Sequence, residues 1–217
     1  IWKRVRHKSY RAEGADVKPA TLKLSQMIKM PSVIACSMMF LTSCAVEVIC
    51  GAWGSTYLVT SKGLDPAKAA AVVTLYYVGM AVGRFLSGVL ASRLSLWKII
   101  HIGQALTFIA IIILALPFGA SVSAAGLFLI GVGNAPLFPN LNHLTPDNFG
   151  PEYSQSVMGV QMSGGYVGFL LISPLFGVLG QLLGTQILPW YLLVLYVFMM
   201  VATFAMVRIM KRDGRYK

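Results

Sequence analysis

Six long apolar stretches constrain this chain more than any other feature of its sequence. A helix needs about 20 mostly apolar residues to cross a bilayer, and six stretches meet that need: 31–58, 67–91, 97–117, 121–143, 154–183 and 187–207. Apolar types make up 57% of the 217 residues and charged types only 12%, too few charges to cover a soluble domain of this size. Lipid cannot satisfy free backbone groups, and these runs are too long and continuous for barrel strands. We therefore predict an all-α membrane protein with six transmembrane helices.

The positive charge of the chain is concentrated at its two ends. Residues 1–29 carry eight Lys and Arg against two acids, residues 208–217 carry five against one, and the stretch between them contributes only +1 of the total +11. This distribution argues against a nucleic-acid-binding domain. It indicates topology, because Lys and Arg gather in cytoplasmic flanks of membrane spans. We expect a cytoplasmic loop at 1–29, a six-helix bundle at 30–209 and a cytoplasmic tail at 210–217.

The beginning of the chain has neither an initiator Met nor the features of a signal peptide. Residues 1–29 mix basic, polar, Gly and Pro residues, which is typical of a loop that follows an earlier span. Ile1 and Trp2 would be the end of that span. We therefore interpret the chain as a fragment of a longer protein.

The sequence lacks the motifs of several other function classes. Cys36, Cys44 and Cys50 have no close pair of the zinc or redox type, and the three His are scattered, so we expect no metal and no cofactor. No His-Glu-x-x-His cluster or comparable nucleophile-and-base spacing supports an intramembrane enzyme. No phosphate-binding loop with a Gly-Lys-Ser/Thr ending supports ATP-driven transport.

Residues 88–98, Gly-Val-Leu-Ala-Ser-Arg-Leu-Ser-Leu-Trp-Lys, resemble the loop signature of the major facilitator superfamily, loosely Gly-x-Leu-Ala-Asp-Arg-x-Gly-Arg-Arg/Lys. Gly88, Arg93 and Lys98 match it, whereas Ser92 replaces the acid and Ser95 the glycine. This weakened form is similar to the copy in the second half of such transporters. Residues 131–140 and 154–177 resemble the interrupted tenth helix and the eleventh helix of sugar-permease-like members.

The resemblance implies helices seven to twelve of a twelve-helix transporter, arranged as two inverted three-helix repeats. It implies transport by rocking alternating access, with residues 1–29 as the central cytoplasmic loop and the N-terminal six-helix half as partner. It also implies that Arg84, Gly88, Arg93 and Lys98 belong to a gate that ties helix ends together. The alternative for the two arginines is a role as topology anchors whose long side chains reach the membrane surface.

Small residues recur at a spacing of four along the second span, at Gly79, Gly83, Ser87 and Ala91. Such a stripe lets a neighbouring helix backbone approach closely. The pair Gly164 and Gly168 and the pair Gly180 and Gly184 repeat this pattern. The stripes fit a sliding helix seam, and they fit a static bundle equally.

Glu47 is the only acid deep within a predicted span, sixteen residues after Pro31. An ionisable group at this depth costs a few kcal/mol even on the lenient insertion scale, so it must face protein or water. We interpret Glu47 as a group that carries a proton or binds a substrate donor. The alternative is an acid hydrogen-bonded to another helix for structural reasons.

Breaks in the helices give a second indication of a site, because transporters often bind their substrates at discontinuous helices. Pro136 and Pro139 interrupt the fourth span and Pro174 the fifth, since each proline removes a backbone donor. Freed carbonyls and the amides of Asn134 and Asn140 would then face a wet cavity. The alternative is a packed kink.

Further aromatic and amide side chains complete the candidate site. The aromatic candidates are Trp53, Tyr57, Tyr76 and Tyr77, with interfacial anchoring as the alternative, and the amide candidates are Gln155 and Gln161. This set lacks the cation cluster that a strongly anionic solute requires and suits a neutral, hydroxyl-rich or amphipathic solute.

These observations favour the C-terminal half of a secondary transporter that moves a small, sugar-like solute, coupled to a proton or other cation, across a bacterial cytoplasmic membrane. We do not expect an enzyme. One alternative is an efflux transporter of the same fold for drugs or other organic solutes. The other is a six-helix structural or regulatory module that pairs with itself or binds a partner.

Overall fold

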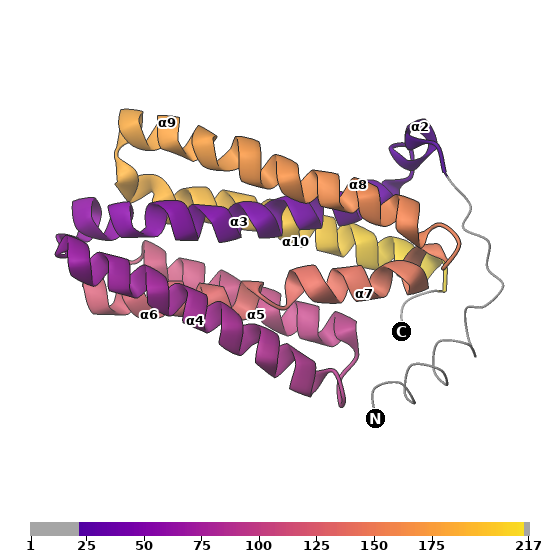
Figure 1. Ribbon diagram of the computed structural model, residues 1–217, viewed down its shortest axis with the longest axis horizontal. Helices are drawn as coiled ribbons and strands as arrows, with labels where there is room; N and C mark the ends of the chain where they lie inside the picture. Colours follow the sequence, from indigo (N-terminus) through magenta and orange to yellow (C-terminus); the bar gives the residue numbers. More distant parts are fainter. Residues whose placement is uncertain (1–21, 215–217) are drawn as a thin grey trace, which may run out of the picture.

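The computed structural model describes residues 22–214 as a bundle of helices laid along one common axis (Figure 1). After the short helix α2 (Leu24–Met27), six helical stretches are long and apolar enough to cross a membrane. They are α3 (Pro31–Lys62), α4 (Pro66–Leu90), α5 (Leu96–Ala115), α6 and α7 (Ala120–Asn134 and Leu137–Phe149), α8, η1 and α9 (Ser154–Val167, Gly168–Ile172 and Ser173–Leu183), and η2 and α10 (Thr185–Ile187 and Leu188–Arg212). The predicted all-α class with six membrane-spanning helices is confirmed.

Helix α3 lies in the middle of the bundle. In Figure 1, α10 runs beside α3, α8 and α9 lie above this pair, and α4 to α7 lie below it. The α3–α4 turn lies at one end, whereas α2, the α7–α8 connection and the end of α10 lie at the other. Of the predicted cytoplasmic loop and tail, residues 1–21 and 215–217 lie outside the described residues.

The α3–α4 turn follows from its sequence. Gly63 adopts a φ of 66°, a left-handed conformation that closes α3 and that glycine reaches without steric cost. Asp65 then caps α4, since its Oδ1 accepts hydrogen bonds from the backbone amides of Ala67 at 3.0 Å and Lys68 at 3.3 Å. Pro66 occupies the first position of α4, where no intrahelical amide bond is lost.

Small residues bring helix backbones into direct contact, as predicted for the first stripe. A Cβ at Gly79 would meet the carbonyl of Phe128, and one at Gly83 would meet that of Val132, so α4 lies directly against α6. Gly164 and Gly168 approach α3 in the same way. In the third pair, Gly184 instead forms a turn with a φ of 86°.

The fourth span is interrupted where the prolines predicted a break, between Asn134 and Leu137. Pro139 costs little there, because it is the third residue of α7 and an amide at that position has no intrahelical acceptor. The end of this span differs from the expectation of 143. Helix α7 continues through Pro146 to Phe149 and ends at Gly150, whose φ is 90°.

The fifth span contains a feature that the sequence did not predict. Residues Gly168–Ile172 form the π-helical turn η1 between α8 and α9, and Pro174 lies in the first turn of α9. A π-turn leaves backbone groups without their usual partners. Here the Tyr191 hydroxyl of α10 donates a hydrogen bond to the carbonyl oxygen of Ile172 at 2.9 Å.

Candidate functional site

Glu47 lies near the midpoint of α3 and faces α4. Its Oε1 is 3.9 Å from Nη2 of Arg84, and the two side chains are 27% and 56% exposed. The backbone carbonyl of Glu47 accepts a hydrogen bond of 3.4 Å from the hydroxyl of Tyr76. Arg84 therefore lies beside Glu47, although the sequence had assigned it to a gate at the helix end.

Tyr77 lies next to this pair. Its hydroxyl rests against Gly51, one turn beyond Glu47, where a Cβ would collide with the phenol oxygen. Its ring meets that of Tyr76 edge-on, with centroids 5.2 Å apart. Tyr76 is fully buried, whereas Tyr77 is 52% exposed. The α3–α4 cluster is defined here as Glu47, Gly51, Tyr76, Tyr77 and Arg84.

The α3–α4 cluster places two exposed side chains, Tyr77 and Arg84, beside the partly buried Glu47, and their chemistry is complementary. A carboxylate accepts hydrogen bonds and a guanidinium donates them, while a phenol does both. The Glu47–Arg84 distance is long for a charge-assisted hydrogen bond, and a half-exposed pair of this kind contributes little to stability. These groups are therefore available to an incoming ligand or proton at low cost to the fold.

The other two aromatic candidates lie in packing contacts toward the end of α3 that carries the α3–α4 turn. The indole Nε1 of Trp53 donates a hydrogen bond to Oγ of Ser173 at 3.2 Å, and its ring meets Phe176 edge-on at 5.5 Å. Tyr57 is buried, and its hydroxyl donates to the carbonyl of Leu114 at 3.2 Å. Both side chains connect α3 to neighbouring helices.

The amide candidates form buried hydrogen bonds between helices. Asn134 Nδ2 donates to the carbonyl of Ser43 at 3.0 Å, and Asn140 Nδ2 donates to Oγ of Ser87 at 3.0 Å. Gln161 Nε2 lies 3.2 Å from Cys36 Sγ, and its Oε1 accepts from Thr145 Oγ1 at 3.0 Å. Sequence reasoning missed these partners, because spacing within one helix does not reveal which polar group of another helix lies opposite. Gln155 is exposed at the start of α8.

The residues of the loop signature lie around the α4–α5 turn. Gly88 has open space where a side chain would be, and Arg93 and Lys98 are exposed. Within residues 22–214, neither cation has an acidic partner at ion-pair distance. The family signature has an acid at the position of Ser92, so the serine at this position agrees with the lack of an acidic partner for Arg93.

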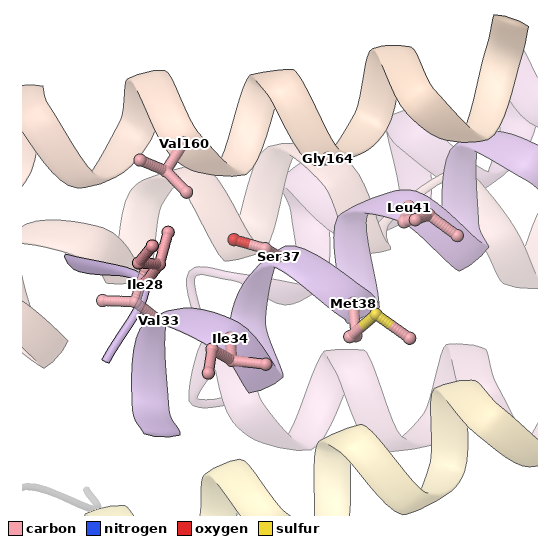
Figure 2. A pocket seen from close by; sticks show the side chains of 8 residues that line it. All are labelled: Ile28, Val33, Ile34, Ser37, Met38, Leu41, Val160 and Gly164. Carbon is pink, nitrogen blue, oxygen red and sulfur yellow. The ribbon is translucent and has the colours of Figure 1, made fainter. Parts of the chain in front are cut away.

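A groove between α3 and α8 lies apart from these residues, near the bundle end that carries α2 (Figure 2). Its lining residues are Ile28, Val33, Ile34, Ser37, Met38, Leu41, Val160 and Gly164. Ser37 supplies the only polar side chain among them, and none of the predicted site residues takes part. The α3–α4 cluster is therefore the better candidate for binding a polar solute.

A sequence model of the Major Facilitator Superfamily matches residues 35–216. The chain belongs to this superfamily. It is accordingly an integral, multi-pass membrane protein of a transporter family, with six helices able to cross a bilayer in its described part. The lipid bilayer is therefore a partner of the described helices.

Individual proteins resemble the chain over different lengths. It is 31% identical over 120 residues to a "Putative glucose/galactose transporter" of Helicobacter pylori, which covers 55% of this chain and 29% of that protein. The chain spans less than a third of the length of this curated relative. Its fold matches a crystal structure of peptide transporter POT in complex with sulfate, with a TM-score of 0.73, 19% identity and coverage of 91% of this chain and 41% of that one.

The E. coli fucose:proton symporter FucP is similar as well, with a TM-score of 0.66, 17% identity and coverage of 82% of this chain and 44% of that one. At such identities, the two structural likenesses show the fold alone. Both solved chains are more than twice as long as the part that this chain matches.

Proposed function

We propose that this chain is the C-terminal half of a proton-coupled secondary transporter for a small, sugar-like solute. The single observation that carries this proposal is the α3–α4 cluster, with Glu47 at mid-membrane depth in a protein of this superfamily. Two similar proteins support the solute class and the coupling: the curated relative described as a glucose/galactose transporter, and FucP, which is a fucose:proton symporter.

Glu47 is the proposed proton carrier and Arg84 its partner. When Glu47 is ionised, the guanidinium 3.9 Å away compensates its charge. When Glu47 takes up a proton, that attraction is lost, and the exposed Arg84 side chain becomes free to donate to solute oxygens. Proton binding at Glu47 is thereby coupled to solute binding at Arg84.

The solute would contact groups that can both donate and accept hydrogen bonds. Tyr77 offers an exposed phenol and an aromatic face beside Glu47, which suits the hydroxyls and apolar face of a sugar ring. Asn134, Asn140 and Gln161 remain predicted solute contacts. Each would have to exchange an interhelical hydrogen bond for one to the solute, so we assign them to a state in which the bundle has opened.

The membrane arrangement follows the charge of the ends. We propose that the bundle end carrying α2 and the end of α10 faces the cytoplasm of a bacterial cell, because Lys and Arg are concentrated there. The N-terminal six-helix half would cover the exposed side of α3 and α4 and complete the solute site. Alternating access would then be a rocking of the two halves around that site.

The test uses the full-length transporter in proteoliposomes, with radiolabelled glucose, galactose and fucose and an imposed pH gradient. We expect Glu47→Gln to abolish accumulation against a gradient, while solute exchange at equal pH is much less affected. Glu152→Gln, which changes an acid at the α7–α8 connection, is the matched control and should accumulate solute normally. Accumulation at the wild-type level by Glu47→Gln would refute the proton role.

The same assay separates the two transport hypotheses. If wild-type vesicles move none of the three sugars but expel an amphipathic dye, the solute class is wrong and the efflux alternative is correct. If residues 1–217 alone transport solute, the half-transporter proposal fails.

A further inference from the structure

A basic pocket lies at the α4–α5 turn, away from the α3–α4 cluster. Its lining residues are Leu94, Lys98, His101 and Ile102. Lys98 and His101 are three residues apart in the first two turns of α5, so their side chains project from the same face of the helix. Arg93 directly precedes Leu94 and is exposed. The basic pocket therefore carries two cationic side chains and an imidazole beside it or in its wall.

The charge of the basic pocket is not neutralised by the described part of the chain. Neither Arg93 nor Lys98 has an acid within ion-pair distance among residues 22–214, and the acids of the same bundle end, Asp147 and Glu152, pair with neither of them. The Nδ1 atom of His101 lies 2.6 Å from the carbonyl oxygen of Trp97. Because a carbonyl can only accept, Nδ1 carries the proton, and Nε2 is free to donate to a phosphate oxygen when the ring is in its imidazolium form.

An apolar groove continues from the basic pocket toward the middle of the bundle. It runs between α4, α5 and α6, and Ile102 lines both the pocket and the groove. Apart from Ser87, its lining is apolar, and its larger side chains are those of Leu86, Leu90, Ile99, Leu106 and Val132. Cationic groups at a helix end thus adjoin an apolar groove, which is the combination that an anionic headgroup and an acyl chain require.

We propose that this combined site binds an anionic phospholipid, with its phosphate at Lys98 and His101 and an acyl chain in the α4–α5–α6 groove. A free anion would use only the cations and leave the groove unexplained. A zwitterionic lipid would fill the groove but bring an ammonium group toward Arg93 and Lys98. Charge and shape together select a lipid with net negative charge. Basic side chains at the membrane surface attract such lipids.

The experiment measures lipid retention by native mass spectrometry on the purified full-length transporter. We expect wild-type protein to retain dioleoyl phosphatidylglycerol in preference to dioleoyl phosphatidylcholine. Lys98→Gln should weaken phosphatidylglycerol binding about five-fold, the amount expected for one basic group at an anionic surface. His101→Gln in addition should weaken it further. Lys68→Gln, which removes an exposed lysine at the opposite bundle end, is the matched control and should leave retention unchanged.

Two further measurements distinguish the sources of the phosphate. Dihexanoyl phosphatidylglycerol should bind less tightly than the dioleoyl lipid, because it cannot fill the groove, and inorganic phosphate should not displace the long-chain lipid at equal concentration. The proposal is overturned if Lys98→Gln, alone and with His101→Gln, retains phosphatidylglycerol as the wild type does, or if phosphatidylcholine is retained equally. It is also overturned if inorganic phosphate displaces the lipid, since the site would then be one for a free anion.

Discussion

The contact of α4 with α6 at Gly83 is tight enough for a single methyl group to disturb it. A Cβ at this position would lie 2.9 Å from the carbonyl carbon and 3.0 Å from the Cα of Val132. Ordinary van der Waals contact begins at 3.4 Å. The carbonyl oxygen of Val132 would lie closer still, so the two backbones would have to move apart, and neither is a flexible side chain that could move aside. Overpacking of this kind costs about 1–3 kcal/mol.

Helix propensity opposes this cost only in part, because Ala is about 0.5–1 kcal/mol better than Gly within a helix. Gly83→Ala should therefore lower the free energy of unfolding by about 2 kcal/mol at most. For a domain of about 200 residues this corresponds to a fall of at most roughly 4–8 °C in Tm. Because Arg84 follows Gly83 directly, the shift of α4 should also move the guanidinium relative to Glu47 and reduce uptake.

The assay is thermal unfolding of the full-length transporter in detergent, followed by intrinsic fluorescence. Gly88→Ala is the matched control: it makes the same change in the same helix, where a Cβ would meet nothing within 4 Å. This variant should gain the higher helix propensity of alanine without a clash, so its Tm should stay the same or rise. Equal Tm values for the two variants, or a higher Tm for Gly83→Ala, would refute the close-packing argument.

Two other variants test the polar contacts. Arg84→Gln should abolish uptake in proteoliposomes yet lower Tm by less than about 4 °C, because a partly exposed pair at 3.9 Å contributes under about 1 kcal/mol to stability. A larger fall in Tm would assign Arg84 a structural role instead. Gln161→Leu should lower the free energy of unfolding by about 0.5–1.5 kcal/mol in urea titration, because the buried hydroxyl of Thr145 loses Gln161 Oε1 as an acceptor and keeps only the carbonyl of Leu141. Gln155→Leu, at an exposed position of the same helix, should have no comparable effect.

The class of the fold could be predicted from the sequence because span length is a local property. A run such as 31–58 has one stable arrangement in lipid, a helix, whatever surrounds it. The break before Leu137 was predictable for the same reason, since Pro136 acts on its own helix. The structure adds Pro146, which α7 accommodates, and Gly150, which ends the helix by its backbone conformation.

The candidate site could be predicted only as separate residues. Glu47, Tyr76, Tyr77 and Arg84 were each singled out, but their association depends on how α3 and α4 face each other, which neither helix determines alone. Asn134 illustrates the converse. Its place at a helix break was visible in the sequence, whereas its hydrogen bond to the carbonyl of Ser43, 91 residues away, depends on tertiary packing.

The π-helical turn at Gly168–Ile172 has a consequence for how this chain aligns with other members of its family. A π-turn holds one more residue than the α-helical turn it replaces, while the helices on both sides keep their direction and facing. Removing one residue between 168 and 172 would yield a continuous α-helix in which α8 and α9 still present the same side chains to α3. Relatives with an uninterrupted helix should therefore align with this chain across a one-residue gap at this place. In this chain the Tyr191 hydroxyl donates to the carbonyl of Ile172. In such relatives, a hydroxyl at the same place would not find an unpaired carbonyl there.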